Sequence, residues 1–476
     1  MHTRRSFLKY LAGAAGTSLL RPTAAAAGCD LYEGLAHILH QFPEEYFAGL
    51  SLDAKRRLFA YLYHAVRRKG SETGGNGDAD IIAEAPALPA FTLNSPYKAY
   101  LGDPHGHSRN SDGMRSADTY YAYAKKMGLD FAVLTDHAEI LSPREWNLNQ
   151  AATAEHYAPG AFVTLSAFEY TNLVDGHYDV YLLHDDDGPV AYSQVTGWYN
   201  LFVWRYNDYS NDNVMANPAL LFAALKKSRQ PGIVNDVMAV PHHCSWGLGP
   251  TNWDYFDAEV VHFAEGYSKH GNSVFPSWYD DFFDQIPVHK EGCSVMDALS
   301  SGKRIGIMAA TDNHSGRPGS IHIVHPRASV RKYSGGLTGV LVEQDAVFDR
   351  RALWRALKNR RIYGTRSFGL QMSFRVAEHE MGSVIASDTE PVFSLEVYSP
   401  PNELQLPLVN QIQYVEIIKN GQIWFREKNL SDRNHVVIDG LRDVFFDASE
   451  RSYYFLRVVG YSGDLAWSSP IFINPS

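Results

Sequence analysis

Residues 97–137 read YKAYLGDPHGHSRNSDGMRSADTYYAYAKKMGLDFAVLTDH. An apolar segment, a helical segment and a second apolar segment follow one another in this stretch. The helical segment, residues 117–126, follows Ser116, whose side chain suits an N-cap, and precedes Gly128, where a helix readily ends. Both apolar segments run directly into aspartate and histidine. The order predicts a strand, a helix and a second strand, with polar side chains at both strand ends.

The same design recurs along the chain. Apolar runs end on His, Asp or Glu in AFVTLSAFEYT (161–171), DVYLLH (179–184), VMAVPHHCS (237–245), EVVHFAEGY (259–267) and RIGIMAATDNH (304–314). The region closes with a strand, a helix capped by Asp349 and a final strand. Strands that alternate with helices favour a parallel sheet or barrel, whose ligands gather at the carboxyl ends of the strands. We therefore expect an α/β domain, a (β/α) barrel, over residues 97–366.

The regions on either side of this barrel have different patterns. From residue 367 apolar and polar residues alternate, with an Asn-Gly turn at 420 and 421, which predicts an antiparallel β-sandwich over residues 367–476. Residues 30–96 indicate a helical segment, with Ser51 as an N-cap, followed by a polar, Gly-rich linker. We expect the sandwich to brace the barrel, because it carries no acidic cluster that would bind a cation.

Residues 1–29 have the features of an export signal. Arg4 and Arg5 form a twin arginine, followed by a short apolar run and small residues. The run is too short and too rich in Ala and Gly to span a bilayer, so we expect a removable twin-arginine signal and a periplasmic or otherwise exported protein. Cys29 follows small residues, as at a lipoprotein cleavage site, which leaves a lipid anchor open.

Charge and cysteine content exclude some classes of partner and structure. The 476 residues carry a formal net charge of −10, so nothing suggests a nucleic-acid or anionic-membrane partner. Three cysteines, Cys29, Cys244 and Cys293, give no disulfide framework. A single bridge between Cys244 and Cys293 stays open.

The residues at the strand ends are those that bind divalent metal ions. Neutral imidazoles and carboxylates hold such ions, and alternate residues of a strand share a face, so an H-x-H pair points both rings into one cavity. His105 and His107 have this spacing. Further residues of these types occur at other strand ends: Asp136, His137, Glu169, His177, His184, His242, His243, Asp312 and His314. So many strand ends of this kind predict a metal cluster rather than a set of core histidines.

The order of these motifs resembles the PHP (polymerase and histidinol phosphatase) superfamily of metal-dependent phosphoesterases. Its opening signatures H-x-H-S, S-D-G and T-D-H are present at residues 105–108, 111–113 and 135–137. Its later signatures resemble Glu169, Pro241-His242 and Asp312-Asn313-His314. More narrowly, EGYSKHGNS (265–273), ATDNHSGRPG (310–319) and AWSSPIF (466–472) are similar to an exported PHP-like branch, domain of unknown function 3604. The resemblance covers roughly residues 97–476.

The resemblance implies a distorted (β/α)7 barrel with two to three divalent ions per chain, zinc, manganese or iron. The implied ligands are His105, His107, Glu169 and Asp312 for one part of the cluster, with Glu169 bridging, and Asp112, His137, His242 and His314 for the rest. The ligand after the Glu is His177 or His184, with His177 preferred because it precedes the apolar run. His242 matches its position better than His243. Asp136 is better suited to orienting a metal-bound imidazole than to binding the ion.

Such a cluster predicts hydrolysis of a small anionic substrate, most simply a phosphate ester. Two metals that share a water lower its pKa toward neutrality, while a third binds a substrate oxygen. The candidate contacts to the phosphoryl oxygens are Arg317, Lys269 and His270, and His270 or His243 could protonate a leaving group. The aromatic-rich residues 195–210 are an insertion that either walls the pocket, binds a sugar ring or only packs.

Two other functions stay open. An amidohydrolase-type hydrolase of amides, lactones or other esters also opens with H-x-H on a barrel, but it usually adds a lysine between two metals and a lone Asp at the last strand. The pair Asp312 and His314 argues against it. The non-enzyme alternative is a metal-binding or glycan-binding surface protein that has kept the barrel.

Overall fold

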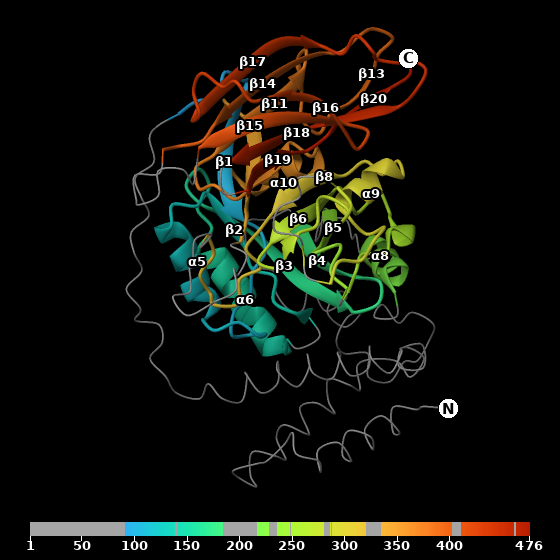
Figure 1. Ribbon diagram of the computed structural model, residues 1–476. Helices are drawn as coiled ribbons and strands as arrows, with labels where there is room; N and C mark the ends of the chain where they lie inside the picture. The colour runs from blue at the N-terminus through green and yellow to red at the C-terminus, as the bar shows by residue number, and fades with distance from the viewer. Residues whose placement is uncertain are drawn as a thin grey trace, which may run out of the picture.

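The computed structural model of the chain describes residues 91–138, 141–183, 217–227, 236–247, 249–279, 286, 288–319, 335–401, 411–460 and 463–476 (Figure 1). Several expectations fall outside these residues: the export signal, Cys29, the helix that starts after Ser51, its linker, His184 and the aromatic-rich stretch at 195–210. Among the helices that are described, none is both long enough and apolar enough to cross a membrane.

The fold is mixed α/β, with more strands than helices among the described residues, so the predicted class is confirmed. The first part contains β1 (Tyr97–Asp103), α5 (Ala117–Lys126), β2 (Phe131–Val133), α6 (Pro143–Glu155), β3 (Val163–Asn172), β4 (Gly176–Leu183), α8 (Pro218–Lys227), β5 (Asp236–His242), η4 (Trp253–Tyr255), β6 (Phe263–Ser268), β7 (Gly271–Asn272), α9 (Val295–Ser300), β8 (Gly306–Ala309), β9 (Leu337–Glu343), α10 (Arg350–Lys358) and β10 (Ile362–Thr365). The second part contains β11 (Gln371–Val376), β12 (His379–Glu380), β13 (Val384–Ala386), β14 (Val392–Tyr398), β15 (Ile412–Lys419), β16 (Gln422–Glu427), β17 (His435–Arg442), β18 (Ser452–Gly460), β19 (Gly463–Ser468) and β20 (Ile471–Asn474).

Parallel and antiparallel pairs both occur in the first part. β1, β2 and β3 pair in parallel, as the strand–helix–strand order predicts. β3 pairs antiparallel with β4, because residues 173–175 are too few for the crossover that a parallel pair requires, and β4 also pairs antiparallel with β5. This hairpin departs from the expected parallel order. It also reverses β4, so that the first residues of β4 lie at the carboxyl ends of β3 and β5.

The remaining strands of the first part lie beside these. β6 pairs in parallel with β8 in a small separate sheet, and β9 pairs antiparallel with β1. Ala239 in β5 donates a backbone hydrogen bond of 2.8 Å to Val260, just before β6. The Thr338 hydroxyl in β9 donates to the carbonyl of Ala309 in β8 at 2.6 Å. The strand ladders are interrupted at these two places, so the (β/α)7 barrel stays a prediction.

Local signals set several element ends as expected. Ser116 and Asp349 accept hydrogen bonds from backbone N–H groups in the first turns of α5 and α10. Gly128 has a φ of +73°, which suits the residue after a helix. Asn420 and Gly421 both have positive φ, 49° and 80°, in the turn between β15 and β16. The predicted caps and the predicted Asn-Gly turn are confirmed.

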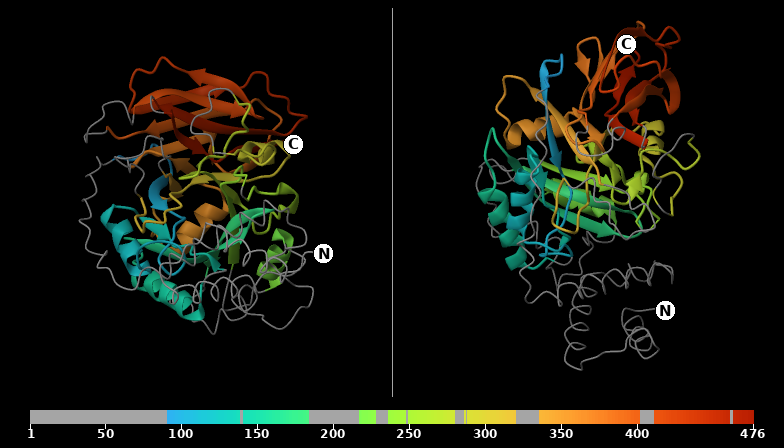
Figure 2. Two further views of the ribbon diagram at one scale, coloured as in Figure 1. Left: turned by 60° about the horizontal axis from the view of Figure 1, so that its bottom comes forward. Right: turned by 60° about the vertical axis from the view of Figure 1, so that its left-hand side comes forward.

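The C-terminal strands form two layers around a shared apolar core. β12, β11, β14 and β17 make one sheet, and β15, β16 and β18–β20 lie in the other. Phe374 and Val397 from the first layer pack in the same core as Ile417 and Leu456 from the second. Figures 1 and 2 show these strands in orange and red, packed on the first part of the chain. The second layer continues past the predicted boundary at residue 366, since β19 pairs antiparallel with β10.

Candidate metal centre

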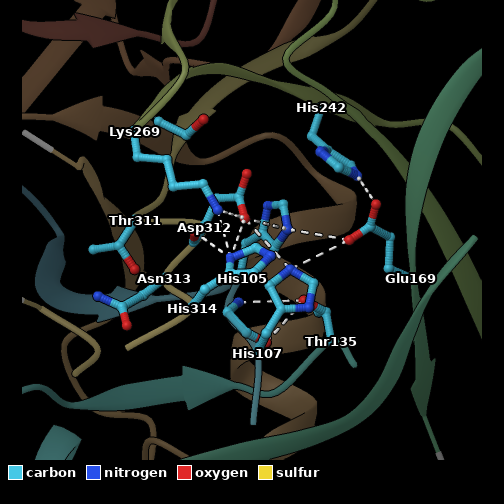
Figure 3. Close-up of polar contacts among 12 residues, drawn as sticks. His105, His107, Thr135, Glu169, His242, Lys269, Thr311, Asp312, Asn313 and His314 are labelled. Carbon is cyan, nitrogen blue, oxygen red and sulfur yellow. Dashed lines mark hydrogen bonds and ion pairs between the residues drawn. The ribbon is translucent and has the colours of Figure 1, made fainter. Parts of the chain in front are cut away.

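Polar side chains from several elements converge at one edge of the first part, as Figure 3 shows for some of them. They are His105 and His107 after β1, Asp112 in the following loop, His137 after β2, Glu169 in β3, His177 in β4, His242 at the end of β5, and Asp312 and His314 after β8. The reversal of β4 explains the position of His177, which lies directly opposite His242 in the β4–β5 ladder. All of them are buried except His314, which is half-buried.

The Glu169 carboxylate lies among five imidazoles. Three nitrogens face its Oε2, namely His107 Nε2 at 3.3 Å, His137 Nδ1 at 3.4 Å and His105 Nε2 at 3.7 Å. Two nitrogens face its Oε1, namely His177 Nδ1 at 2.9 Å and His242 Nε2 at 3.2 Å. Each oxygen therefore has its own set of imidazoles, which is the arrangement that a carboxylate bridging two ions requires.

Asp312 is the second carboxylate at the centre. Its Oδ1 lies 3.3 Å from His107 Nε2 and 3.6 Å from His105 Nε2. Lys269 Nζ donates to the same oxygen at 2.9 Å, and His270 Nε2 lies 2.8 Å from Oδ2. Asp312 has a φ of +49°, a backbone conformation that is strained for a residue with a side chain and that recurs at functional sites.

Asp112 forms a third carboxylate position on the other side of His107. Its Oδ2 lies 2.9 Å from His314 Nε2, and its Oδ1 lies 3.6 Å from His107 Nδ1 and 3.7 Å from His137 Nε2. His107 thus lies between two groups of carboxylates: its Nε2 faces Glu169 and Asp312, and its Nδ1 faces Asp112.

Several of these groups could hold metal ions. Four overlapping sets place one donor atom per residue within 4.8 Å of the others: His107, Asp112, His137 and His314; His105, His107 and Asp312; His105, Glu169, Asp179 and His242; and His177, His242 and His243. Within the described residues, His105 Nε2 and both ring nitrogens of His107 and His242 are buried without a hydrogen bond of acceptable geometry. Leaving such an atom unsatisfied costs about 1–3 kcal/mol, and a bound cation would satisfy it. Imidazole and carboxylate donors suit zinc, manganese and iron.

Two further carboxylates contact Nδ1 of His105, the ring nitrogen opposite the one that faces Glu169. Neither was predicted from the sequence. Glu265 Oε2 lies 2.8 Å from His105 Nδ1, and Asp179 Oδ2 lies 3.3 Å from the same atom. Asp179 lies opposite Glu169 in the β3–β4 ladder. Its sequence signal is the spacing His177-x-Asp179, the same two-residue step that singled out His105 and His107. A carboxylate on the second nitrogen orients an imidazole whose first nitrogen binds a metal.

Asp136 supports the loop between His107 and Asp112. Its Oδ1 accepts from the Ser108 backbone N–H at 2.7 Å and from the Ser111 hydroxyl, and its Oδ2 accepts from Asn149 Nδ2 at 2.8 Å. We expected Asp136 to orient a metal-binding imidazole. These contacts instead hold the loop, and Glu265 and Asp179 are the carboxylates that contact an imidazole, that of His105.

The predicted substrate-contacting groups lie at different places. Lys269 contacts both Asp312 and His314 Nδ1, so it lies inside the cluster together with His270. The ring of His243 is buried, with its centroid 4.3 Å from that of His242.

The backbone of Arg317 closes the loop after His314 through Asn313. Its N–H donates to Asn313 Oδ1 at 2.9 Å, and its carbonyl accepts from Asn313 Nδ2 at 3.0 Å. These bonds close the loop after His314 and do not themselves bring the guanidinium to the cluster.

The two central carboxylates, Glu169 and Asp312, are both favoured in their charged form. Burial raises the pKa of Glu169, but His137 and His242 outweigh this effect and hold the pKa well below its usual value. Burial likewise raises the pKa of Asp312, but nearby positive charges, of which Lys269 is the largest influence, hold this pKa well below its usual value. Burial lowers the pKa of His242 to about 3, and this favours the neutral form of the ring that binding of a metal requires.

Comparisons with curated proteins give relatives that are themselves uncharacterised. No model of a known protein family matches the chain. An uncharacterised protein of Chlamydia pneumoniae is 23% identical over 407 residues, which cover 83% of this chain and 60% of that protein. One of Chlamydia muridarum is 25% identical over 412 residues, again 83% and 60%. The chain therefore spans about 60% of the length of these relatives.

Comparisons with solved structures give distant likenesses. One is a two-domain protein of Bacteroides vulgatus containing a predicted PHP-like metal-dependent phosphoesterase, with a TM-score of 0.39, 12% identity, and coverage of 82% of this chain and 99% of that one. A second is a proposed metal-dependent phosphoesterase of Bifidobacterium adolescentis, with a TM-score of 0.26, 12% identity and coverage of 57% and 97%. A third is an amidohydrolase of Chromobacterium violaceum, with a TM-score of 0.23, 15% identity and coverage of 45% and 87%. At these TM-scores we infer neither fold nor activity from the likenesses.

Proposed function

We propose that the chain is a metal-dependent hydrolase that cleaves a phosphate ester of a small molecule. The observation that carries the proposal is the crowding of buried ligand atoms around Glu169 and Asp312, whose oxygens face His105 and His107 at 3.3–3.7 Å. Burying so many ionisable groups together is costly unless cations bind, which favours a functional role. The motifs at residues 105–108 and 312–314 support membership of the PHP superfamily, and with it the exported branch, as part of the same proposal.

Some residues of the centre would bind the ions, and others orient those ligands. The residues that would hold the ions are His105, His107, Asp112, His137, Glu169, His177, His242, Asp312 and His314. Bound divalent ions would acidify a water molecule and neutralise ester oxygens, which hydrolysis of an anionic ester requires. Glu265 and Asp179 fix the ring of His105 through Nδ1 and leave Nε2 to face the centre.

Cationic and proton-donating groups lie beside Asp312. The Lys269 ammonium is half-buried within this cluster, where a phosphoryl oxygen would be drawn to it. His270, on the other oxygen of Asp312, and His243 are the candidates to protonate a leaving group. Arg317 is the further candidate for a phosphoryl contact, from its loop after His314.

The test combines metal content with turnover. We would count metals in the purified protein by elemental analysis and assay the same sample with p-nitrophenyl phosphate and bis-p-nitrophenyl phosphate. We expect two to three divalent ions per chain. His105→Ala and Asp312→Ala should each lose metal, and their turnover should fall by at least about 1,000-fold. His379→Ala, which removes an exposed histidine in β12, serves as the matched control and should change neither quantity.

Other outcomes separate the competing functions. Metals without hydrolysis of either phosphate would reject the phosphoesterase and direct the search to carboxylic esters, lactones and amides. The presence of Lys269 inside the cluster is the observation that favours this second candidate, an amidohydrolase-type enzyme. Metals with no hydrolysis of any of these would leave a metal-binding or glycan-binding surface protein. No bound metal would remove the basis of the proposal.

We also propose that the protein is exported, on the strength of the twin arginine at Arg4 and Arg5. Fractionation of cells that express the full chain should place it outside the cytoplasm, and Arg4→Lys with Arg5→Lys should retain it inside. A lipid anchor at Cys29 predicts that exported protein stays with the membrane fraction and is released by Cys29→Ala. Retention of the parent chain in the cytoplasm would refute export.

A further inference from the structure

A cavity of about 310 Å³ lies between α9 and the C-terminal strands. Lys303 and Arg304 line it from the segment between α9 and β8, and Arg451 and Tyr453 line it from the start of β18. Arg304 precedes β8 whereas Asp312 follows it, so the cavity and the metal centre lie toward opposite ends of this strand. The four residues of β8 alone span about 13 Å. The cavity is therefore separate from the metal centre.

The lining is positively charged. It includes three cationic side chains and no Asp or Glu, in a chain whose net charge is −10. Arg304 donates to Asn474 Oδ1 at 2.8 Å, and Lys303 donates to the hydroxyl of Ser301 at 2.9 Å. Because both partners are neutral oxygens, these bonds position the cations without cancelling their charge. Arg360 lies close to Arg304: burial, and then the charge of Arg304, lower the pKa of Arg360.

One negative group near the cavity, Asp297 of α9, is already engaged. Asp297 is the acidic residue close enough to act on the Tyr453 hydroxyl, although burial is the larger cause of the raised pKa of that tyrosine. The Asp297 carboxylate accepts from the backbone N–H of Ser294 at 2.9 Å and from its hydroxyl at 2.6 Å. The backbone N–H groups of residues 301–303 donate to the carbonyls of residues 297–299, at the end of α9. Neither the carboxylate nor these carbonyls compete for the three cations.

The cavity also offers neutral hydrogen-bonding groups. The Tyr453 hydroxyl lies 3.1 Å from the hydroxyl of Ser300, and Asn420 and Asn474 add side-chain amides to the lining. The volume falls at the small end of the range for ligand pockets, about 300–1,000 Å³, and suits a ligand of the size of a monosaccharide. Lys303 and Arg304, held by neutral partners, and Arg451 beside them, with amides and hydroxyls around, match the oxygens of a tetrahedral oxyanion.

We propose that this cavity is a second binding site, which takes the phosphate or sulfate group of a small molecule or saccharide. The site goes beyond the proposed hydrolase, because none of its lining residues belongs to the metal centre. It also gives the junction between α9 and the C-terminal strands a role in binding, in addition to packing.

The test uses the full chain and calorimetric titration at constant ionic strength. The probes are inorganic sulfate, inorganic phosphate and glucose 6-sulfate, and sulfate is included because it is not a substrate of a phosphoesterase. The double variant Arg304→Gln with Arg451→Gln should bind sulfate at least about tenfold more weakly than the parent chain. The control Arg442→Gln, which removes an exposed arginine of β17 outside the lining, should bind as the parent does. The unfolding temperature of each variant checks that it is folded.

A variant of the metal centre distinguishes this site from the proposed catalytic one. Asp312→Ala should bind sulfate with unchanged affinity if the cavity is the site. Sulfate binding that is lost in Asp312→Ala but kept in the double variant would overturn the inference, and so would the absence of binding to the parent chain. Tighter binding of glucose 6-sulfate than of sulfate would show that the group is carried on a sugar, whereas equal affinity would identify the free anion as the ligand.

Discussion

Lys269 places an ammonium group inside a cluster whose other side chains attract cations. Its Nζ lies 2.9 Å from Asp312 Oδ1 and also contacts His314. Without bound metal, this ammonium compensates part of the charge of the carboxylates. With metal bound, the same charge would oppose the ions and would attract the anionic substrate of the proposed hydrolase, so the two roles of Lys269 can be separated by experiment.

Lys269→Met should bind metal more tightly and turn over more slowly. Removing a positive charge next to the ions lowers the dissociation constant of the metal by about tenfold, after allowance for screening of a half-buried group. Removing it from the substrate side lowers kcat by about 100-fold. A competitive chelator titration and steady-state kinetics measure the two effects. The control is Lys358→Met, which removes the remote ion pair with Asp236, and weaker metal binding in Lys269→Met would show that the lysine mainly supports Asp312.

Asp130 predicts a pH dependence of stability that is independent of the metal centre. Its Oδ2 accepts from the Leu101 backbone N–H at 2.8 Å, and burial raises its pKa from 3.8 to about 6. The protonated carboxyl is thus favoured in the folded protein. Its contribution to stability is complete below pH 4 and is lost as the pH rises through 6.

Asp130→Asn should remove this dependence, because the amide resembles the protonated acid and can still accept from Leu101. We expect the free energy of unfolding of the parent chain to fall by about 2–3 kcal/mol relative to the variant between pH 4 and pH 7. Urea denaturation across this range measures the difference. A difference that is constant with pH would contradict the assigned cause.

At the scale of elements, the short β6–β7 hairpin carries Lys269 and His270 to Asp312, and the C-terminal layer holds that hairpin. Asn272 in β7 donates to Asp464 Oδ2 in β19 at 3.1 Å and accepts from the Val274 backbone N–H at 2.9 Å. Asp464 is itself held by Arg457, whose Nη2 lies 2.7 Å from its Oδ1. The hairpin is thereby linked to a buried ion pair of the C-terminal strands.

Asn272→Ala should lower turnover more than it lowers stability. The variant loses the link to Asp464, while the ion pair with Arg457 remains, so we expect a loss of about 1–2 kcal/mol in the free energy of unfolding. The freed hairpin should lower kcat by about tenfold or more. Ser373→Ala, which removes the hydrogen bond of 2.7 Å from the buried Ser373 hydroxyl to Glu380 in the C-terminal strands, is a matched control and should keep its kcat. Equal effects of the two variants on kcat would show that the hairpin is positioned by other contacts.

Local sequence patterns predicted the ends of several helices and turns. They did not predict how strands that are distant in the sequence pair. The caps at Ser116 and Asp349 depend on a few adjacent residues, so the sequence identifies them. The direction of β4 follows from its three-residue connection to β3, and the pattern of alternating apolar runs did not reveal how short that connection is. Asp179 and Glu265 were overlooked for this reason, because each acts on His105 only after the strands are assembled.

At the scale of the whole molecule, the two predicted domains share one sheet. β9, β10 and β19 are successive neighbours in it, with Gly364 opposite Trp467. Trp467 also packs against Tyr267 in β6, with ring centroids 5.7 Å apart. The composition change at residue 366 marks where the helices of the described residues stop, while the sheet continues across it from β10 to β19.

A chain truncated after residue 366 should therefore fail to fold, and the full chain should unfold in one transition. Truncation exposes the β10 edge and removes the apolar partners that the C-terminal strands supply. Expression of residues 91–366 should give insoluble protein, and calorimetry of the full chain should give a single peak. A soluble, metal-binding fragment of residues 91–366 or two separate transitions would show that the parts are independent.

The pairing of β10 with β19 also constrains how the protein is made. About a hundred residues of chain separate these strands, and at a typical rate of synthesis they take about 5–20 seconds to emerge from the ribosome. During that interval the edge of β10 has no partner and can pair with a neighbouring nascent chain. Slowing synthesis within the last hundred codons should therefore increase aggregation, and a chaperone that covers exposed strands should restore the yield.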